Sequence, residues 1–150
     1  MFTDSYGNHF VVTRYTTAWT SKFLHKECDY DCFVVNRTVH LPAEDIGVVA
    51  ATLADRQCKW IEVFGFDAER LHDAIDEAAV AIGRQTKIGD GDPMTSWNDE
   101  SITESEIAAY VLTGGQGTSD WKLVLVIGDE NAERQLSAEI NSVGGERGHR

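Results

Sequence analysis

Long hydrophobic runs are missing from the sequence, which excludes a protein built of membrane-spanning helices. No apolar stretch in the 150 residues approaches the ~20 residues that a membrane-crossing helix needs. The first ten residues, MFTDSYGNHF, contain neither a basic segment nor an apolar core, so they do not resemble a secretion signal. We therefore expect a cytoplasmic protein that folds as a single domain over residues 1–150.

Cysteine is scarce as well. The odd number of three, in a chain without an export signal, argues against a disulfide framework and favours reduced thiols. His25, Cys28 and Cys32 have the spacing H-x2-C-x3-C, and His40 and Cys58 add a further imidazole and thiol. A zinc site usually has a close pair of ligands at both ends of a loop, and here only one end has a pair. We expect no metal site.

Motifs for phosphate binding and catalysis are absent. The sequence contains neither G-x-x-x-x-G-K-[ST] nor a G-x-G-x-x-G between a strand and a helix. The glycine-rich segment 113–117 precedes a predicted strand, so it has no helix N-terminus to offer a phosphate. G-x-S-x-G, H-E-x-x-H and a recognisable Ser-His-Asp set are also missing. We therefore predict no cofactor and no catalytic residue, and the missing motifs favour a non-enzymatic function over an enzyme.

Positive charge is missing from a long segment of the chain. No Lys or Arg occurs from Ile88 to Trp121, a segment that holds seven acidic residues, and the net charge of the chain is −12. Residues 61–150 carry seven Lys/Arg against eighteen Asp/Glu. Such a surplus repels nucleic acid and anionic membranes and favours a basic protein partner. Simple solubility is the alternative explanation.

Strand and helix patterns alternate along the chain. Apolar, β-branched runs predict buried strands over 32–39, 59–66 and 121–128, each followed by a helical pattern. This order predicts a three-layer α/β fold with a mainly parallel, Rossmann-like sheet flanked by helices. Residues 1–31 are expected to form an N-terminal β-hairpin or edge extension of the 32–143 core. Residues 144–150 are expected to form a disordered tail.

Three predicted helices begin at recognisable capping residues. Asp67 and Asp129 follow predicted strands and suit helix N-caps, and Ser101 with Glu104 has the form of a capping box. The helix after Asp67 has a clear apolar stripe and an acidic opposite side. The acidic residues on this side include Glu69, Asp73 and Asp76.

The segment GDGDPMTSWNDE, residues 89–100, invites comparison with a calcium loop. Asp90 and Asp92 fit the first two ligand positions of an EF-hand, but the later positions do not match. Asp-Gly-Asp-Pro is instead typical turn chemistry. Trp97, among several acids, is compatible with an interaction surface, or with a side chain that covers the edge of the sheet. Both interpretations remain open at this point.

The leading functional hypothesis is a binding module for a basic protein. Its most concrete form is an immunity-type or inhibitor protein that neutralises a nuclease toxin or another nucleic-acid enzyme, and a homo-oligomer is also possible. The expected partner-binding residues are Asp90, Asp92, Trp97, Asp99 and Glu100, backed by Glu69, Asp73 and Asp76.

The alternative hypothesis is a small-molecule binding domain or an enzyme that uses the rim at the carboxyl ends of the strands, where ligands bind in open parallel sheets. Arg37 would hold a nucleotide-like anion, and the aspartates would serve as polar anchors. The expected residues of this rim are Asn36, Arg37, His40, Asp67, Asp129 and Glu130.

Overall fold

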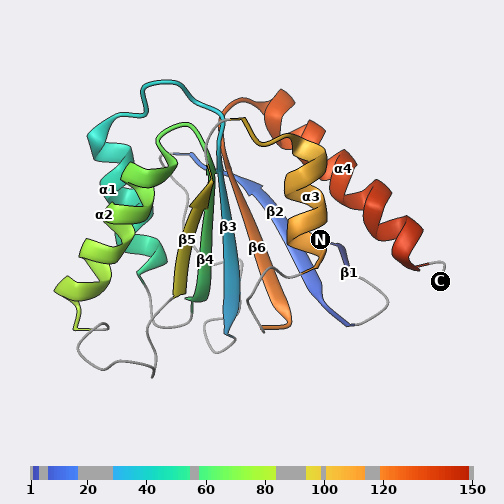
Figure 1. The fold of residues 1–150 in the computed structure, drawn as a ribbon, viewed down its shortest axis with the longest axis horizontal. Coiled ribbons are helices and arrows are strands. Elements are labelled where there is room, and N and C mark those ends of the chain that lie inside the picture. The colour runs from blue at the N-terminus through green and yellow to red at the C-terminus, as the bar shows by residue number, and fades with distance from the viewer. Residues whose placement is uncertain are drawn as a thin grey trace.

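The computed structural model describes residues 2–3, 7–16, 29–54, 58–83, 94–98, 101–113 and 119–148. It contains one six-stranded sheet with the order β1-β2-β6-β3-β4-β5, covered by helices on both faces (Figure 1). The strands are β1 (Phe2–Thr3), β2 (His9–Arg14), β3 (Tyr30–Asn36), β4 (Cys58–Gly65), β5 (Met94–Asn98) and β6 (Trp121–Ile127). The helices are α1 (Ala43–Leu53), α2 (Ala68–Ala81), α3 (Glu104–Leu112) and α4 (Glu130–Gly148).

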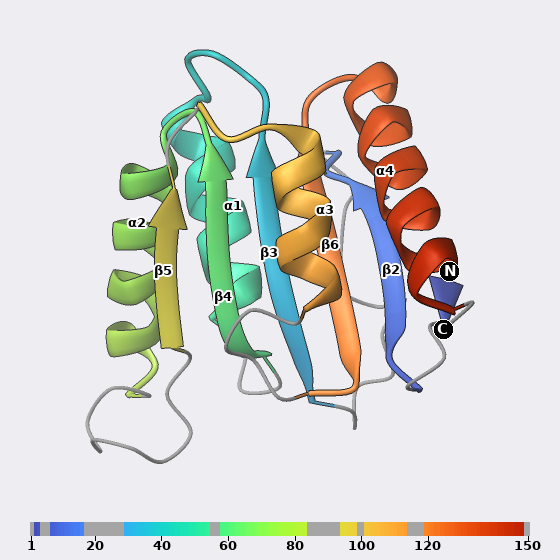
Figure 2. The ribbon, with the colours of Figure 1, turned by 45° about the vertical axis from the view of Figure 1, so that its right-hand side comes forward.

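The α/β prediction is confirmed. Strands β2 to β6 are mutually parallel, and Figure 2 shows the arrowheads of β3, β4 and β5 at the same end of the sheet. Strand β1 runs antiparallel to β2, which confirms the N-terminal hairpin at the edge. Strand β2 also belongs to the main sheet, because it pairs along its whole length with β6. None of the described helices is both long and apolar enough to cross a membrane.

Alternate residues of the central strands supply two separate cores. Val34, on one face of β3, packs in a cluster with residues of α1 and α2. Its neighbours Phe33 and Val35 belong to a second cluster with residues of α3 and α4. Because both faces are covered, all seven residues of β3 are buried, which explains its nearly continuous apolar sequence.

Two buried charges join the central strands β3 and β6. Lys122 Nζ donates to Asp31 Oδ2 at 2.5 Å, and these side chains are 4% and 0% exposed. The same carboxylate oxygen accepts a hydrogen bond from the backbone N–H of Ser119. The two charged residues are direct register partners, so their attraction specifies the alignment of the two strands.

Three local features differ from the sequence-based expectations. Residues 94–98 form strand β5 at the edge of the sheet, parallel to β4, in a segment where the sequence analysis expected no strand. The capping box of α3 is formed by Thr103 and Glu106 and not by Ser101 and Glu104. Both pairs fit the same S/T-x-x-E pattern, and the sequence alone does not distinguish between them. Helix α4 continues to Gly148, into the segment expected to be a tail.

Gly65 ends strand β4 in a conformation that favours glycine. Its φ is +99°, and a Cβ atom at this position would lie 2.0 Å from the backbone oxygen of Asn36 on β3. That oxygen also accepts a hydrogen bond from the N–H of Phe66. The close approach of these two backbones therefore shapes the carboxyl ends of β3 and β4.

We expect Gly65→Ala to destabilise the protein by about 3 kcal/mol, because both the positive φ and the clash with Asn36 must be accommodated. Urea denaturation measures the free energy of unfolding. Gly47→Ala is the matched control, since a Cβ there meets no atom within 4 Å inside α1. This control should stabilise the protein by about 0.5–1 kcal/mol. Equal stability of the two variants would contradict the prediction.

Removal of one partner of the buried pair should be costly. We expect Lys122→Met to lower the free energy of unfolding by about 3–5 kcal/mol, because Asp31 is left as an unpaired buried charge. The double variant Asp31→Val, Lys122→Met should recover most of this loss, since neither charge then remains. Denaturation of the single and double variants measures both effects. A double variant less stable than Lys122→Met would show that the lost charge pair is not the cause.

Candidate functional site

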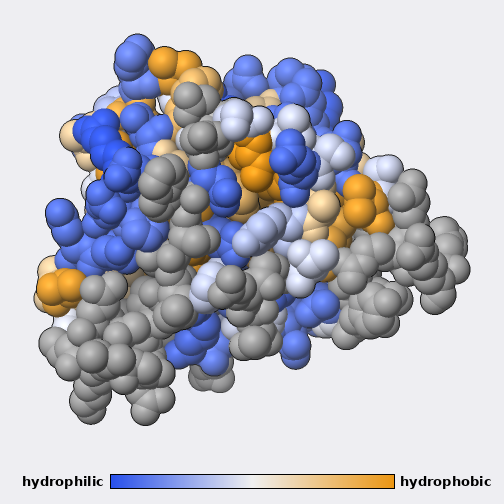
Figure 3. All heavy atoms as spheres, in the orientation of Figure 1, coloured by the Kyte–Doolittle hydropathy of each residue, from blue (hydrophilic) through white to orange (hydrophobic). Residues whose placement is uncertain are grey.

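The outer side of α2 carries a stripe of carboxylates. Glu69, Asp73 and Glu77 are spaced four residues apart, which places them on one face of the helix. All three are exposed, and the space-filling view shows mostly hydrophilic side chains in the region of α2 (Figure 3). The opposite face of α2 buries Leu71 and Ile75 in the core, so the sequence period determines which side remains outside.

A groove of about 410 Å³ runs beside this stripe, between α2 and α1. Its apolar lining is Ile46 from α1 and Ala74 from α2, and its acidic lining is Glu69, Asp73 and Glu77. The guanidinium of Arg70 also lines the groove, and its Nη1 donates to the backbone oxygen of Leu41 at 3.3 Å. The groove thus combines an apolar surface with three carboxylates. We call this groove, together with the carboxylates of Glu69, Asp73 and Glu77 that line it, the acidic groove.

His72 lies close to two of the carboxylates of α2. Its Nδ1 lies 3.1 Å from Asp73 Oδ1 and 3.7 Å from Asp76 Oδ2, and the imidazole is largely buried. Asp76, which the sequence analysis included in the partner-binding set, is half-buried and does not line the groove. Glu77, which was omitted from that set, does line it. Its spacing of four from Asp73 is the sequence signal that could have identified it.

The remaining predicted partner-binding residues lie in the 89–100 segment. Asp90, Asp92, Asp99 and Glu100 fall outside the residues that the structure describes. The backbone of Trp97 lies within β5, where it is the register partner of Val63 on β4. The structural case for a binding surface therefore depends on α2.

At the strand-end rim, Asn36 has a structural role. It is fully buried; its Nδ2 donates to the backbone oxygen of Phe66 at 2.7 Å, and its Oδ1 accepts from the N–H of Thr38 at 2.9 Å. These contacts tie the exit of β3 to the turn that follows β4. Both the nitrogen and the oxygen of this side-chain amide are therefore hydrogen-bonded to backbone groups.

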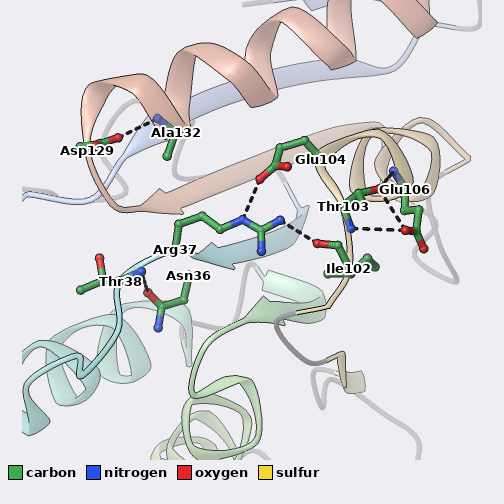
Figure 4. A network of polar contacts seen from close by, with 9 residues as sticks. All are labelled: Asn36, Arg37, Thr38, Ile102, Thr103, Glu104, Glu106, Asp129 and Ala132. Atoms are coloured by element: carbon green, nitrogen blue, oxygen red, sulfur yellow. Dashed lines mark hydrogen bonds and ion pairs between the residues drawn. The ribbon is translucent and has the colours of Figure 1, made fainter.

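Arg37 is also engaged (Figure 4). Its Nε lies 2.9 Å from Glu104 Oε1, and its Nη2 donates to the backbone oxygen of Ile102 at 2.9 Å. Both partners lie at the start of α3, so the guanidinium anchors that helix to the end of β3. The ion pair with Glu104 also takes up the charge that the anion-binding hypothesis assigned to Arg37.

The other rim residues serve different purposes. Asp129 Oδ1 accepts from the N–H of Ala132 at 2.8 Å, which confirms it as the cap of α4. Asp67 occupies the N-cap position of α2 with a left-handed φ of 54°, but its side chain makes no capping hydrogen bond. His40 is exposed and also has a positive φ of 61°. Glu130 extends from the first turn of α4 toward Arg14, at 3.9 Å.

The cysteines that the structure describes are buried thiols. Cys32 and Cys58 are free and fully buried in the sheet. Burial raises the pKa of the Cys32 thiol, with a smaller effect from the neighbouring Cys58, so this sulfur stays protonated and unreactive. His25 and Cys28 lie outside the described residues. In the described part of the chain, no three His, Cys, Asp or Glu side chains are grouped in a way that could hold a metal ion.

Tyr15 connects the exit of β2 to α1. Its hydroxyl donates to Asp45 Oδ1 at 2.9 Å. Burial raises the pKa of Tyr15 to about 12, and the hydrogen bond to Asp45 and the negative charges of Asp45 and Glu44 add to this rise. This contact ties the segment just beyond β2 to the first turn of α1.

The raised pKa of Tyr15 predicts a loss of stability at alkaline pH. The folded protein keeps the Tyr15 proton that the unfolded chain loses near pH 10, so its contribution is complete below pH 10 and disappears as the pH rises to about 12. Ultraviolet absorbance of tyrosinate, with Tyr15→Phe subtracted, measures this titration. Asp45→Asn should lower the Tyr15 pKa toward 10. An unchanged titration in Asp45→Asn would contradict the assignment.

Comparison with known proteins places the chain in a family. A family model described as Domain of unknown function (DUF7684) matches residues 13–143. The match begins within β2 and ends within α4, so it includes α1, α2 and α3, most of α4 and every strand from β3 to β6. No curated protein matches the chain. Because the family model covers most of its length, the chain belongs to the DUF7684 family.

Proposed function

We propose that this protein binds a basic protein partner through the acidic groove of α2. The observation that carries the proposal is the combination, in one groove, of Glu69, Asp73 and Glu77 with the apolar side chains of Ile46 and Ala74. Lysine and arginine side chains have an apolar stem and a charged end. A groove with an apolar wall and a line of carboxylates complements both parts of such a side chain.

The charges around the groove are available to a partner. Among the described residues, no ion pair is found for Glu69 or Glu77. Helix α1 begins with a further exposed acid, Glu44, outside the groove lining. Charge complementarity of this kind speeds association and determines partner choice more than it raises affinity.

An exposed apolar side chain borders the same surface. Val80, three residues beyond Glu77 on α2, is 55% exposed. Interfaces combine apolar contacts with polar groups at their rim, so this valine would supply contact area beside the carboxylates. The surface therefore has the mixed character of a protein-binding face.

An immunity-type or inhibitor protein is the concrete form of this proposal. Nucleases and other nucleic-acid enzymes present basic surfaces to the phosphate backbone, and an acidic groove competes for those same side chains. The acidic net charge of −12 favours this class of partner and disfavours nucleic acid itself.

Charge neutralisation in the groove tests the proposal. The double variant Asp73→Asn, Glu77→Gln should bind an arginine-rich peptide about tenfold more weakly than the unmodified protein, as measured by fluorescence anisotropy at low salt. In a pull-down from a native lysate, the double variant should also fail to retain basic proteins that the unmodified protein retains. Added salt should slow association, because the attraction between exposed charges is screened.

The matched control is Asp120→Asn, Glu139→Gln. It makes the same change in net charge at two residues that do not line the acidic groove. If only total charge matters, both double variants will lose the peptide equally, and the proposal fails. If only the groove variant loses it, the binding surface is located on α2.

A further inference from the structure

A second groove lies at the carboxyl end of the sheet, beside the end of strand β2. Tyr15, just beyond β2, contacts α1 on one face of the sheet through its hydrogen bond to Asp45. The adjacent strand β6 leads into α4, which packs on the other face (Figure 2). In open α/β sheets, ligands usually bind in a crevice outside the carboxyl ends of the strands.

This groove has a volume of about 500 Å³. We call it the β2–α4 groove. Its lining from the end of β2 includes Arg14 and Thr16. Its lining from α4 consists of residues spaced by three and four, which therefore share one helix face: Glu130, Glu133, Arg134 and Ser137.

The charged groups of the β2–α4 groove are balanced and only loosely paired. The lining contains two guanidinium groups and two carboxylates. Arg14 Nη2 lies 3.9 Å from Glu130 Oε1, and these side chains are 32% and 72% exposed. An exposed pair at this distance is weak. A ligand can therefore replace this contact at little cost.

The guanidinium at the end of β3 differs in this respect. Arg37 Nε lies 2.9 Å from Glu104 Oε1, and its Nη2 donates to the backbone oxygen of Ile102, so its charge is already paired. The Arg14 side chain is 32% exposed, against 16% for Arg37, and its contact with Glu130 is longer, at 3.9 Å. This contrast favours the β2–α4 groove over the end of β3 as the site for a small molecule.

We propose that the β2–α4 groove binds a small zwitterion of the free amino acid class. The guanidinium groups of Arg14 and Arg134 match a ligand carboxylate. The carboxylates of Glu130 and Glu133 match a ligand ammonium, and the hydroxyls of Thr16 and Ser137 supply further hydrogen bonds. A ligand with a single charge would leave one pair of groove charges unmatched, so the balanced lining selects for a ligand that carries both signs.

Ligand binding is tested with the twenty free amino acids at millimolar concentration, with acetate and methylamine as singly charged controls. We expect at least one amino acid to raise the melting temperature. It should also shift the backbone NMR signals of Arg14, Thr16 and the 130–137 segment. Acetate and methylamine should do neither. No response to any amino acid, or an equal response to acetate, overturns the proposal.

Two substitutions on α4 test whether the amino acid binds in the β2–α4 groove. Arg134→Gln should weaken amino acid binding by about tenfold, because one of the two guanidinium groups that would bind the ligand carboxylate is lost. Glu139→Gln, on α4 but outside the groove lining, should bind as the unmodified protein does. The melting temperature of each variant without ligand shows that it is folded. Unchanged affinity in both Arg134→Gln and Arg14→Gln would overturn the assignment.

Discussion

The ion pair between Asp31 and Lys122 is the contact on which the order of the sheet depends. The two residues are 91 positions apart in the sequence, and both are buried. Because an unpaired charge in an apolar interior is costly, the two must lie together. Strand β6 is thereby held beside β3, in the register that pairs these residues. A slip of one residue would turn the lysine to the opposite face. Since β6 also pairs with β2, the same register determines how the carboxyl ends of three strands meet.

The two candidate sites follow from this arrangement and differ in chemistry. One face of the sheet carries α1 and α2, and the acidic groove between them presents the carboxylates on which the proposed contact with a basic partner depends. The crevice between β2 and α4 carries both signs of charge and suits a small ligand. Arg37, the basic residue nearest the centre of the rim, instead holds the start of α3. Its position at a strand end is typical of ligand-binding residues, but its contacts are those of a structural residue.

Sequence patterns predicted the parts of the fold that depend on neighbours along the chain. The buried residues of α1, which are Ile46, Val49, Ala50 and Leu53, follow from helical spacing alone. The acidic side of α2 follows in the same way. Strand β5 was missed because its five residues, MTSWN, show neither a continuous apolar run nor a clear alternation after the turn signals. The partner of Arg37 could not be inferred, since Glu104 is distant in sequence and nothing local connects the two.

The sequence by itself determined the alternation of strands and helices, the burial of the central strands and the acidic surface of α2, because each depends on side-chain periodicity within one element. Only the tertiary structure decided that β6 lies between β2 and β3, that Arg37 is neutralised by Glu104, and that Arg14 meets the first turns of α4. These features depend on contacts between distant segments. Such contacts form only when burial and charge pairing bring the segments together, and local periodicity carries no information about them.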